Sequence, residues 1–245
     1  GFIEEKVKNF DLAYTCFTNS QRNERYDVCN PISFINYINE YGESLNFTDH
    51  SKVKKEFNAK TKEKLAFLIG FPRSGTTLLD TILRSHHQID VLEEKPLIYS
   101  VENIIKTKFK LSLNKIHYLK KEDLDYLRKH YLSELLKYRE PHKKANVFVD
   151  KYPFQTVCLP LINLLFPEAK IIFTHRNPFD TVLSCFQQTF EPNNAMANFT
   201  TLKSSAQIYD LTMQMWVLYK KNLKLDFIIS RYETLLDNFD DQINR

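Results

Sequence analysis

The sequence is poor in cysteine and lacks any Cys-x-x-Cys pair. Its four cysteines are scattered along 245 residues, at Cys16, Cys29, Cys158 and Cys185. Isolated cysteines are typical of free thiols in a reducing compartment rather than of a disulfide framework. We therefore expect a cytoplasmic protein, with a lumenal fragment of a larger protein as the alternative.

The sequence also lacks a long apolar run and a strong excess of one charge. No stretch resembles a signal peptide or a membrane span. The formal net charge is +4, which suits an anionic ligand but is too small to indicate nucleic-acid binding. Hydrophobic residues make up 43% of the chain and aromatic residues 13%, which is enough for one sizeable α/β domain.

One stretch carries a clear signal for ligand binding. An apolar run at residues 65–69 predicts a buried strand, which breaks at Gly70. The turn at residues 72–77, PRSGTT, leads into a helix whose apolar face is formed by Leu78, Leu79, Ile82 and Leu83. In such a unit the free N–H groups and the positive end of the helix dipole point at one place, so we expect a phosphate site. An ordinary turn between strand and helix is the alternative.

This loop lacks the lysine of a nucleoside triphosphate site. Gly70 and Gly75 have the spacing of a Walker A loop, which next requires Lys followed by Ser or Thr. Thr76 stands in the lysine position, and Arg73 supplies a cation earlier. The loop therefore favours a phosphate bound without metal. A metal-dependent P-loop kinase or hydrolase is the disfavoured alternative, since Thr76 replaces the lysine and no aspartate other than Asp150 is an obvious partner for Mg²⁺.

Two motifs together resemble the sulfotransferases that use 3′-phosphoadenosine 5′-phosphosulfate (PAPS). In that family the loop that residues 72–77 match binds the 5′-phosphosulfate, and an Arg and a Ser after a later strand hold the 3′-phosphate. Here Arg176 and Ser184 follow an apolar strand with the family's spacing. The resemblance implies PAPS as co-substrate, adenosine 3′,5′-bisphosphate as product and no metal. It places the nucleotide on Arg73, Ser74, Gly75, Thr76, Thr77, Arg176, Ser184 and Tyr232.

Further features resemble the tyrosylprotein sulfotransferases and the bacterial sulfotransferases fused to tetratricopeptide repeats. They are the pair Glu93-Glu94, a strand ending in Lys151, and a late Arg-Tyr-Glu motif at Tyr232. The resemblance implies that Glu94 is the general base, while Arg73 and Lys151 stabilise developing charge. Glu93 is expected to point away, since neighbours on a strand face opposite sides.

Four other aromatic or basic residues are candidates for a role in the site or in the core. His86 and His87 are alternative bases, because cytosolic small-molecule sulfotransferases use a histidine. Both follow the loop helix, where histidines commonly bond to terminal carbonyl groups, and that structural interpretation is preferred. Tyr232 packs either on adenine or in the core, and Trp216 is expected in the core.

Strands that alternate with helices predict an α/β, P-loop-like fold of three layers, with a central parallel sheet of about five strands flanked by helices. The strands are expected at residues 65–69, 89–92, 146–150, 170–174 and 225–229. Candidate site residues follow these strands, so they can converge at the carboxyl edge of the sheet, where such folds bind ligands. They are Arg73, Glu94, Lys151, Arg176 and Tyr232.

The chain divides into three parts. Residues 1–45 predict a helical extension, either the end of a tetratricopeptide repeat array that binds a protein partner or plain helices packed on the domain. Residues 46–63 predict a polar linker, and residues 64–245 the sulfotransferase domain. Because an Arg-rich segment follows this region in the family, we expect the domain to be truncated at its C-terminus.

The sequence therefore predicts an enzyme that moves a sulfuryl group from PAPS to a hydroxyl or phenol by in-line transfer. The acceptor is a protein tyrosine, a sugar or a small-molecule hydroxyl. Residues 96–140 and 189–203 are expected to form the surface that selects it. A non-catalytic module that keeps the nucleotide pocket is a further hypothesis.

Overall fold

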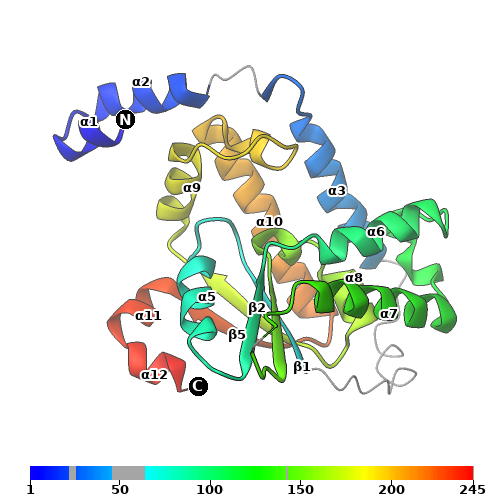
Figure 1. Ribbon diagram of the computed structural model, residues 1–245. Helices are drawn as coiled ribbons and strands as arrows, with labels where there is room; N and C mark the ends of the chain where they lie inside the picture. Colours follow the sequence, from blue (N-terminus) through cyan, green and yellow to red (C-terminus); the bar gives the residue numbers. More distant parts are fainter. Residues whose placement is uncertain (22–25, 46–63, 142, 245) are drawn as a thin grey trace.

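The computed structural model describes residues 1–21, 26–45, 64–141 and 143–244, which surround a five-stranded parallel sheet (Figure 1). In sheet order the strands are β2 (Ile89–Glu93), β3 (Val147–Lys151), β1 (Lys64–Ile69), β4 (Lys170–His175) and β5 (Asp226–Arg231). The predicted α/β fold with a parallel sheet of five strands is confirmed. Each strand lies within two residues of its expected bounds.

Helices cover both faces of the sheet, which makes three layers (Figure 1). One face carries α5 (Thr76–Arg84), α11 (Tyr232–Asp237) and α12 (Phe239–Ile243). The other face carries the larger core, formed with α3 (Pro31–Ser44), α6 (Leu97–Thr107), α7 (Lys121–Lys137), α8 (Leu159–Leu165) and α10 (Leu202–Asn222). Burial on both faces explains why β1 reads as a continuous apolar run.

Side chains alternate between these two faces along each strand. In β1, Phe67 lies in the larger core, whereas Leu68 packs in the smaller cluster on the α5 side. In β3, Phe148 and Val149 divide in the same way. The period of two places the next two residues, Asp150 and Lys151, on opposite faces of the sheet.

The helices expected over residues 1–45 are present, and they pack on the rest of the chain. Of these, α1 (Phe2–Lys6) precedes α2 (Phe10–Gln21), whose Phe17 contacts Phe186 at the end of α9 (Pro178–Gln187). The α3 helix buries Phe34, Ile38 and Tyr41 in the larger core. The tetratricopeptide interpretation and the domain division stay predictions, and the linker predicted at residues 46–63 lies outside the described residues.

Among the described residues, three short 3₁₀ helices complete the fold: η3 (Leu113–Tyr118), η4 (Pro153–Thr156) and η5 (Met196–Phe199). Trp216 is buried and stacks on Phe173 with ring centroids 4.0 Å apart, so its predicted place in the core is confirmed. Within the described ranges, no helix combines the length and the apolar character needed to cross a membrane.

Candidate active site

The loop after β1 is held by bonds that leave no space for a side chain at Gly70. A Cβ atom there would lie 2.2 Å from Thr174 Oγ1 and 2.8 Å from Ser74 Oγ. These two hydroxyl groups are themselves 2.7 Å apart and hydrogen-bonded. The Ser74 amide donates to the Phe71 carbonyl at 3.1 Å, so the amide and the hydroxyl group of Ser74 are both engaged inside the loop. Ser74 therefore shapes the turn from a buried position.

The N-terminus of α5 opens directly from this loop. Gly75 is its N-cap, with a left-handed φ of 102°, a conformation that glycine adopts at little cost. The first helical residues, Thr76 and Thr77, have N–H groups without partners inside the helix. A Cβ atom at Gly75 would lie 2.6 Å from the ring of Tyr232, so the aromatic ring packs directly against the loop.

Four of the residues expected to bind the nucleotide meet beside the loop. Arg73 Nε donates to Ser184 Oγ at 3.0 Å. Arg176 Nη1 donates to the Arg73 carbonyl at 3.4 Å, and the Arg176 guanidinium lies over the Tyr232 ring, 4.8 Å from its centroid. Two arginines, which follow β1 and β4, thus lie close together, and a serine of α9 contacts one of them. Their assignment to particular phosphates stays a prediction.

Arg176 has hydrogen-bonding capacity to spare. Its Nε is buried, and no described residue accepts a hydrogen bond from it. Its nearest carboxylate, Asp180, is 3.9 Å from Nη2. The following helix begins here, because the Asn177 side chain caps α9 by accepting from the amides of Phe179 and Asp180. A buried, unpaired guanidinium nitrogen beside a helix N-terminus fits a phosphate oxygen.

A second cluster, which we call the carboxylate cluster, lies at the ends of β2 and β3 and consists of Lys151, Glu93, Glu94 and Asp80. The Lys151 side chain is fully buried. Its Nζ donates to Glu93 at 2.8 Å and to Glu94 at 3.1 Å, and it lies 3.9 Å from Asp80 of α5. Both glutamates are about half exposed. A buried cation here faces three carboxylates, of which two reach solvent.

The expectation that Glu93 points away is wrong. Glu93 is the last residue of β2 and shares the α5 face with Lys151, with which it pairs in register. Glu94 has already left the strand and has a positive φ of 50°. Its amide donates to the Lys151 carbonyl at 2.8 Å, and its side chain turns back to the same ammonium group. Strand alternation does not apply across this turn.

The two glutamates differ in their other partners. Glu93 lies 3.7 Å from Arg84, which also forms an ion pair with Asp80 one helical turn earlier. The hydrogen bond from Lys151 lowers the pKa of Glu93, and the charges of Lys151 and Arg84 lower it further. The sequence interpretation gave no role to Asp80 or Arg84. The (i, i+4) pairing of opposite charges on the loop helix was the signal that could have identified them.

Asp150 lies apart from this cluster although it precedes Lys151 in β3. It is fully buried on the opposite face, where Tyr131 donates to Oδ2 at 2.8 Å and Gln155 at 3.0 Å. Oδ1 has no partner among the residues that the structure describes. Burial raises the pKa of this carboxyl to about 6. The aspartate that the kinase alternative would use for Mg²⁺ thus points away from the α5 side of the sheet.

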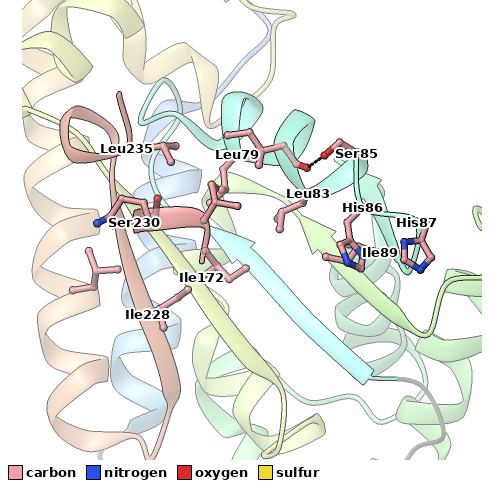
Figure 2. Close-up of a pocket in the computed structure, with 14 residues that line it drawn as sticks. Leu79, Leu83, Ser85, His86, His87, Ile89, Ile172, Ile228, Ser230 and Leu235 are labelled. Atoms are coloured by element: carbon pink, nitrogen blue, oxygen red, sulfur yellow. Dashed lines mark hydrogen bonds between the residues drawn. The ribbon is translucent and has the colours of Figure 1, made fainter. Parts of the chain in front are cut away.

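The two histidines lie at the far end of α5. Their rings stack at 4.8 Å, and the Gln88 amide donates to His86 Nδ1 at 3.2 Å. They border an apolar cavity of about 710 Å³ between α5, β4, β5 and the last helices, which Figure 2 shows. Aliphatic side chains dominate its lining, and Lys151 and the loop are not part of it.

Comparisons with known proteins match most of the chain to one family. The profile of the family described as the sulfotransferase family matches residues 66–245. The chain is 31% identical over 131 residues to protein-tyrosine sulfotransferase 1 from Homo sapiens. It is 30% identical over 147 residues to an uncharacterized protein from Aquifex aeolicus (strain VF5). These matches cover 51% and 54% of this chain, but 35% and 18% of the two relatives.

Two solved structures resemble the fold loosely. A sulfotransferase from Mycobacterium avium matches 86% of this chain and 70% of its own, with a TM-score of 0.48 and 14% identity. A shikimate kinase from Bacteroides thetaiotaomicron matches 74% of this chain and 92% of its own, with a TM-score of 0.40 and 13% identity.

Proposed function

We propose that this chain, which belongs to the sulfotransferase family, transfers a sulfuryl group from PAPS to a hydroxyl or phenol acceptor. PAPS, when bound, supplies the sulfuryl group and provides adenosine 3′,5′-bisphosphate as the leaving group. The observation that carries the proposal is the contact between the two arginine segments: Arg176 donates to the carbonyl of Arg73. The two arginines are therefore close enough to bind one ligand that carries phosphates at two ends.

Different groups of the site are suited to different parts of the donor. The first-turn amides of Thr76 and Thr77 are suited to the 5′-phosphosulfate end, because they carry the positive end of the α5 dipole. Arg176, with its buried Nε, and Ser184 are suited to the 3′-phosphate. Tyr232, packed against Gly75, offers a wall for adenine. Arg73 is exposed, so its guanidinium is available for charge that develops on the sulfuryl oxygens.

The carboxylate cluster supplies the base. Glu94 accepts the proton that the acceptor hydroxyl loses as it attacks, since it is half exposed and Lys151 is its only ion-pair partner among the described residues. Glu93 is held by two cations and is the poorer base. Lys151 positions Glu94 and adds positive charge near the reaction. By analogy with phosphoryl transfer, positioning and charge stabilisation account for most of the catalysis.

Titration calorimetry of the 245-residue chain tests the donor. Adenosine 3′,5′-bisphosphate in EDTA should bind more tightly than ATP with Mg²⁺, because the loop has Thr76 where a triphosphate site needs lysine. Tighter binding of ATP with Mg²⁺ would favour a P-loop kinase instead. Bisphosphate binding without any transfer of radiolabelled sulfate, across peptide, sugar and small phenol acceptors, would favour the non-catalytic module.

Two finer expectations accompany this function. We place the protein in the cytoplasm because its cysteines are scattered, and we assign a protein partner to the helices of residues 1–45. A protein partner retained by the full chain but lost when the exposed face of α2 is substituted would support the second expectation.

A further inference from the structure

A second cavity, of about 450 Å³, lies between α3, α6 and the segment before η5, and we call it the tyrosine cavity. It brings together both segments that were expected to select the acceptor. The lining residues used below are Ser33 and Tyr37 of α3, Tyr99, Glu102 and Lys106 of α6, and Tyr152. Several tyrosine rings thus surround a space large enough for a small ring compound.

The tyrosine cavity adjoins the carboxylate cluster through Tyr152. This residue directly follows Lys151, and its ring packs edge-on against Tyr99 with centroids 5.4 Å apart. Burial raises the pKa of Tyr152, and the nearby charge of Glu94 adds to the rise. Tyr152 therefore connects the cavity wall to the strand end at Lys151, whose carbonyl accepts a hydrogen bond from the Glu94 amide.

Glu102 provides a buried acceptor inside the cavity. Tyr37 and Tyr41 donate to its Oε1 at 2.7 Å and 2.6 Å, and the Cys158 thiol lies 3.6 Å from the same oxygen. In the described part of the chain, no residue donates to Oε2. Glu102 as a whole is only 4% exposed, but it lines the cavity, and Oε2 is not among the buried side-chain atoms without a hydrogen bond, so this oxygen is open to an occupant. The cavity thus has one acceptor position that an occupant can satisfy.

We propose that the tyrosine cavity binds the acceptor, and that this acceptor is a ring carrying at least two hydroxyl groups; the proposal rests on the proposed function. One hydroxyl reaches Glu94 and is sulfated, while another donates to Oε2 of Glu102 and the ring lies against the tyrosines. A phenol with a single hydroxyl cannot serve both carboxylates at once. Sites built to bond a hydroxyl discriminate strongly against compounds that lack it.

This arrangement makes α3 part of the substrate site. Ser33 and Tyr37 form one wall of the cavity, and Tyr37 fixes Glu102 while the Lys106 ammonium lies 5.9 Å from its ring centroid. The helix that the sequence assigns to an extension therefore contributes to acceptor choice as well as to the core.

Ligand-observed NMR on the full chain, with and without adenosine 3′,5′-bisphosphate, tests the proposal with three probes. The probes are methyl β-glucoside, catechol and 4-methylphenol, which separate a sugar, a polyhydroxy aromatic and a single phenol. At least one of the first two should bind about 10-fold or more tightly than 4-methylphenol. Glu102→Gln should reduce that preference by about 10- to 100-fold, since it replaces a charged acceptor.

A second pair of variants keeps the test decisive if Glu102→Gln fails to fold. Ser33→Tyr fills the exposed mouth of the cavity and should abolish ring binding, whereas Ile32→Tyr, on the exposed side of the same helix turn, should not. Binding of none of the probes, equal or tighter binding of 4-methylphenol, or ring binding that survives Ser33→Tyr overturns the proposal. If the wild-type chain binds a ring compound as expected but does not bind adenosine 3′,5′-bisphosphate, the result contradicts the proposed function and not the ring site.

Discussion

The two halves of the candidate site use charge in opposite ways. At the ends of β1, β4 and β5, Arg73 and Arg176 contact mainly neutral groups: a serine hydroxyl, a backbone carbonyl and a tyrosine ring. At the ends of β2 and β3, the fully buried Lys151 faces three carboxylates. The first half has positive charge to spare, and the second has negative charge to spare.

This difference in charge explains how one edge of the sheet can both bind an anionic donor and accept a proton. Cations with neutral partners keep their attraction for an anion, so the first half suits a phosphorylated donor. A single ammonium shared by several carboxylates leaves one of them free to accept a proton. Because β1 and β3 are hydrogen-bonded neighbours, the two halves lie side by side. The comparison predicts that substitutions in one half change affinity for the donor, and in the other half turnover.

The largest effect is expected from Glu94→Gln. If Glu94 is the base, its loss should lower kcat by about 10²- to 10⁴-fold, while the Kd for adenosine 3′,5′-bisphosphate stays unchanged. The matched control is Glu93→Gln, which changes the closer of the two carboxylate contacts to Lys151, at 2.8 Å against 3.1 Å for Glu94. Radiolabelled-sulfate transfer and calorimetry supply the two readouts. Equal losses of turnover in both variants would remove Glu94 from its assigned role.

Arg176→Ala should have the next largest effect, and this effect should be on the Kd for adenosine 3′,5′-bisphosphate. Loss of a charged hydrogen-bonding group should weaken bisphosphate binding by about 10- to 100-fold. Lys170→Ala removes a cation from the opposite end of the same strand, where Lys170 pairs with Asp226, and serves as the control. Calorimetry in EDTA measures both. Similar affinities for the two variants would mean that the cationic half does not hold the donor.

The sequence was sufficient for the fold because its signals were local. Apolar runs predicted the bounds of each strand to within two residues, and the alternation of strands with helices predicted that the sheet is parallel. The spacing of PRSGTT and of Arg176 with Ser184 was enough to predict residues that the structure brings together. These residues follow strand ends, and in a parallel sheet such ends share one edge.

Other features of the site depended on geometry that a linear pattern does not encode. The predicted orientation of Glu93 was wrong because β2 ends one residue later than expected and the backbone turns at Glu94, which has a positive φ. The tyrosine cavity combines α3 with α6, although 65 positions separate Tyr37 from Glu102. Such contacts arise only when helices far apart in sequence pack in one core, and no spacing rule indicates them.

The smallest effect on transfer is expected at Asp150, which adjoins Lys151 in β3 but faces the other side of the sheet. Burial raises the pKa of Asp150 in the folded protein to about 6, above the ordinary aspartate value of 3.8. As pH rises between these values, the unfolded chain loses the proton while the folded chain keeps it, so this carboxyl's contribution to stability falls. Asp150→Asn does not titrate, so its stability relative to wild type should rise by up to about 3 kcal/mol across this window.

Urea denaturation from pH 3.5 to pH 7 measures this difference, and the surface variant Asp241→Asn gives the effect of removing an exposed carboxylate. Turnover of Asp150→Asn at pH 7 should stay close to wild type, because Glu94 and Lys151 remain in place on the α5 side. A loss of turnover comparable with that of Glu94→Gln would contradict the assignment of catalysis to the carboxylate cluster on the α5 side. It would mean that the buried residue on the opposite face of β3 takes part in the reaction. A relative stability that does not change with pH would mean that the pKa of Asp150 is the same in the folded and the unfolded protein.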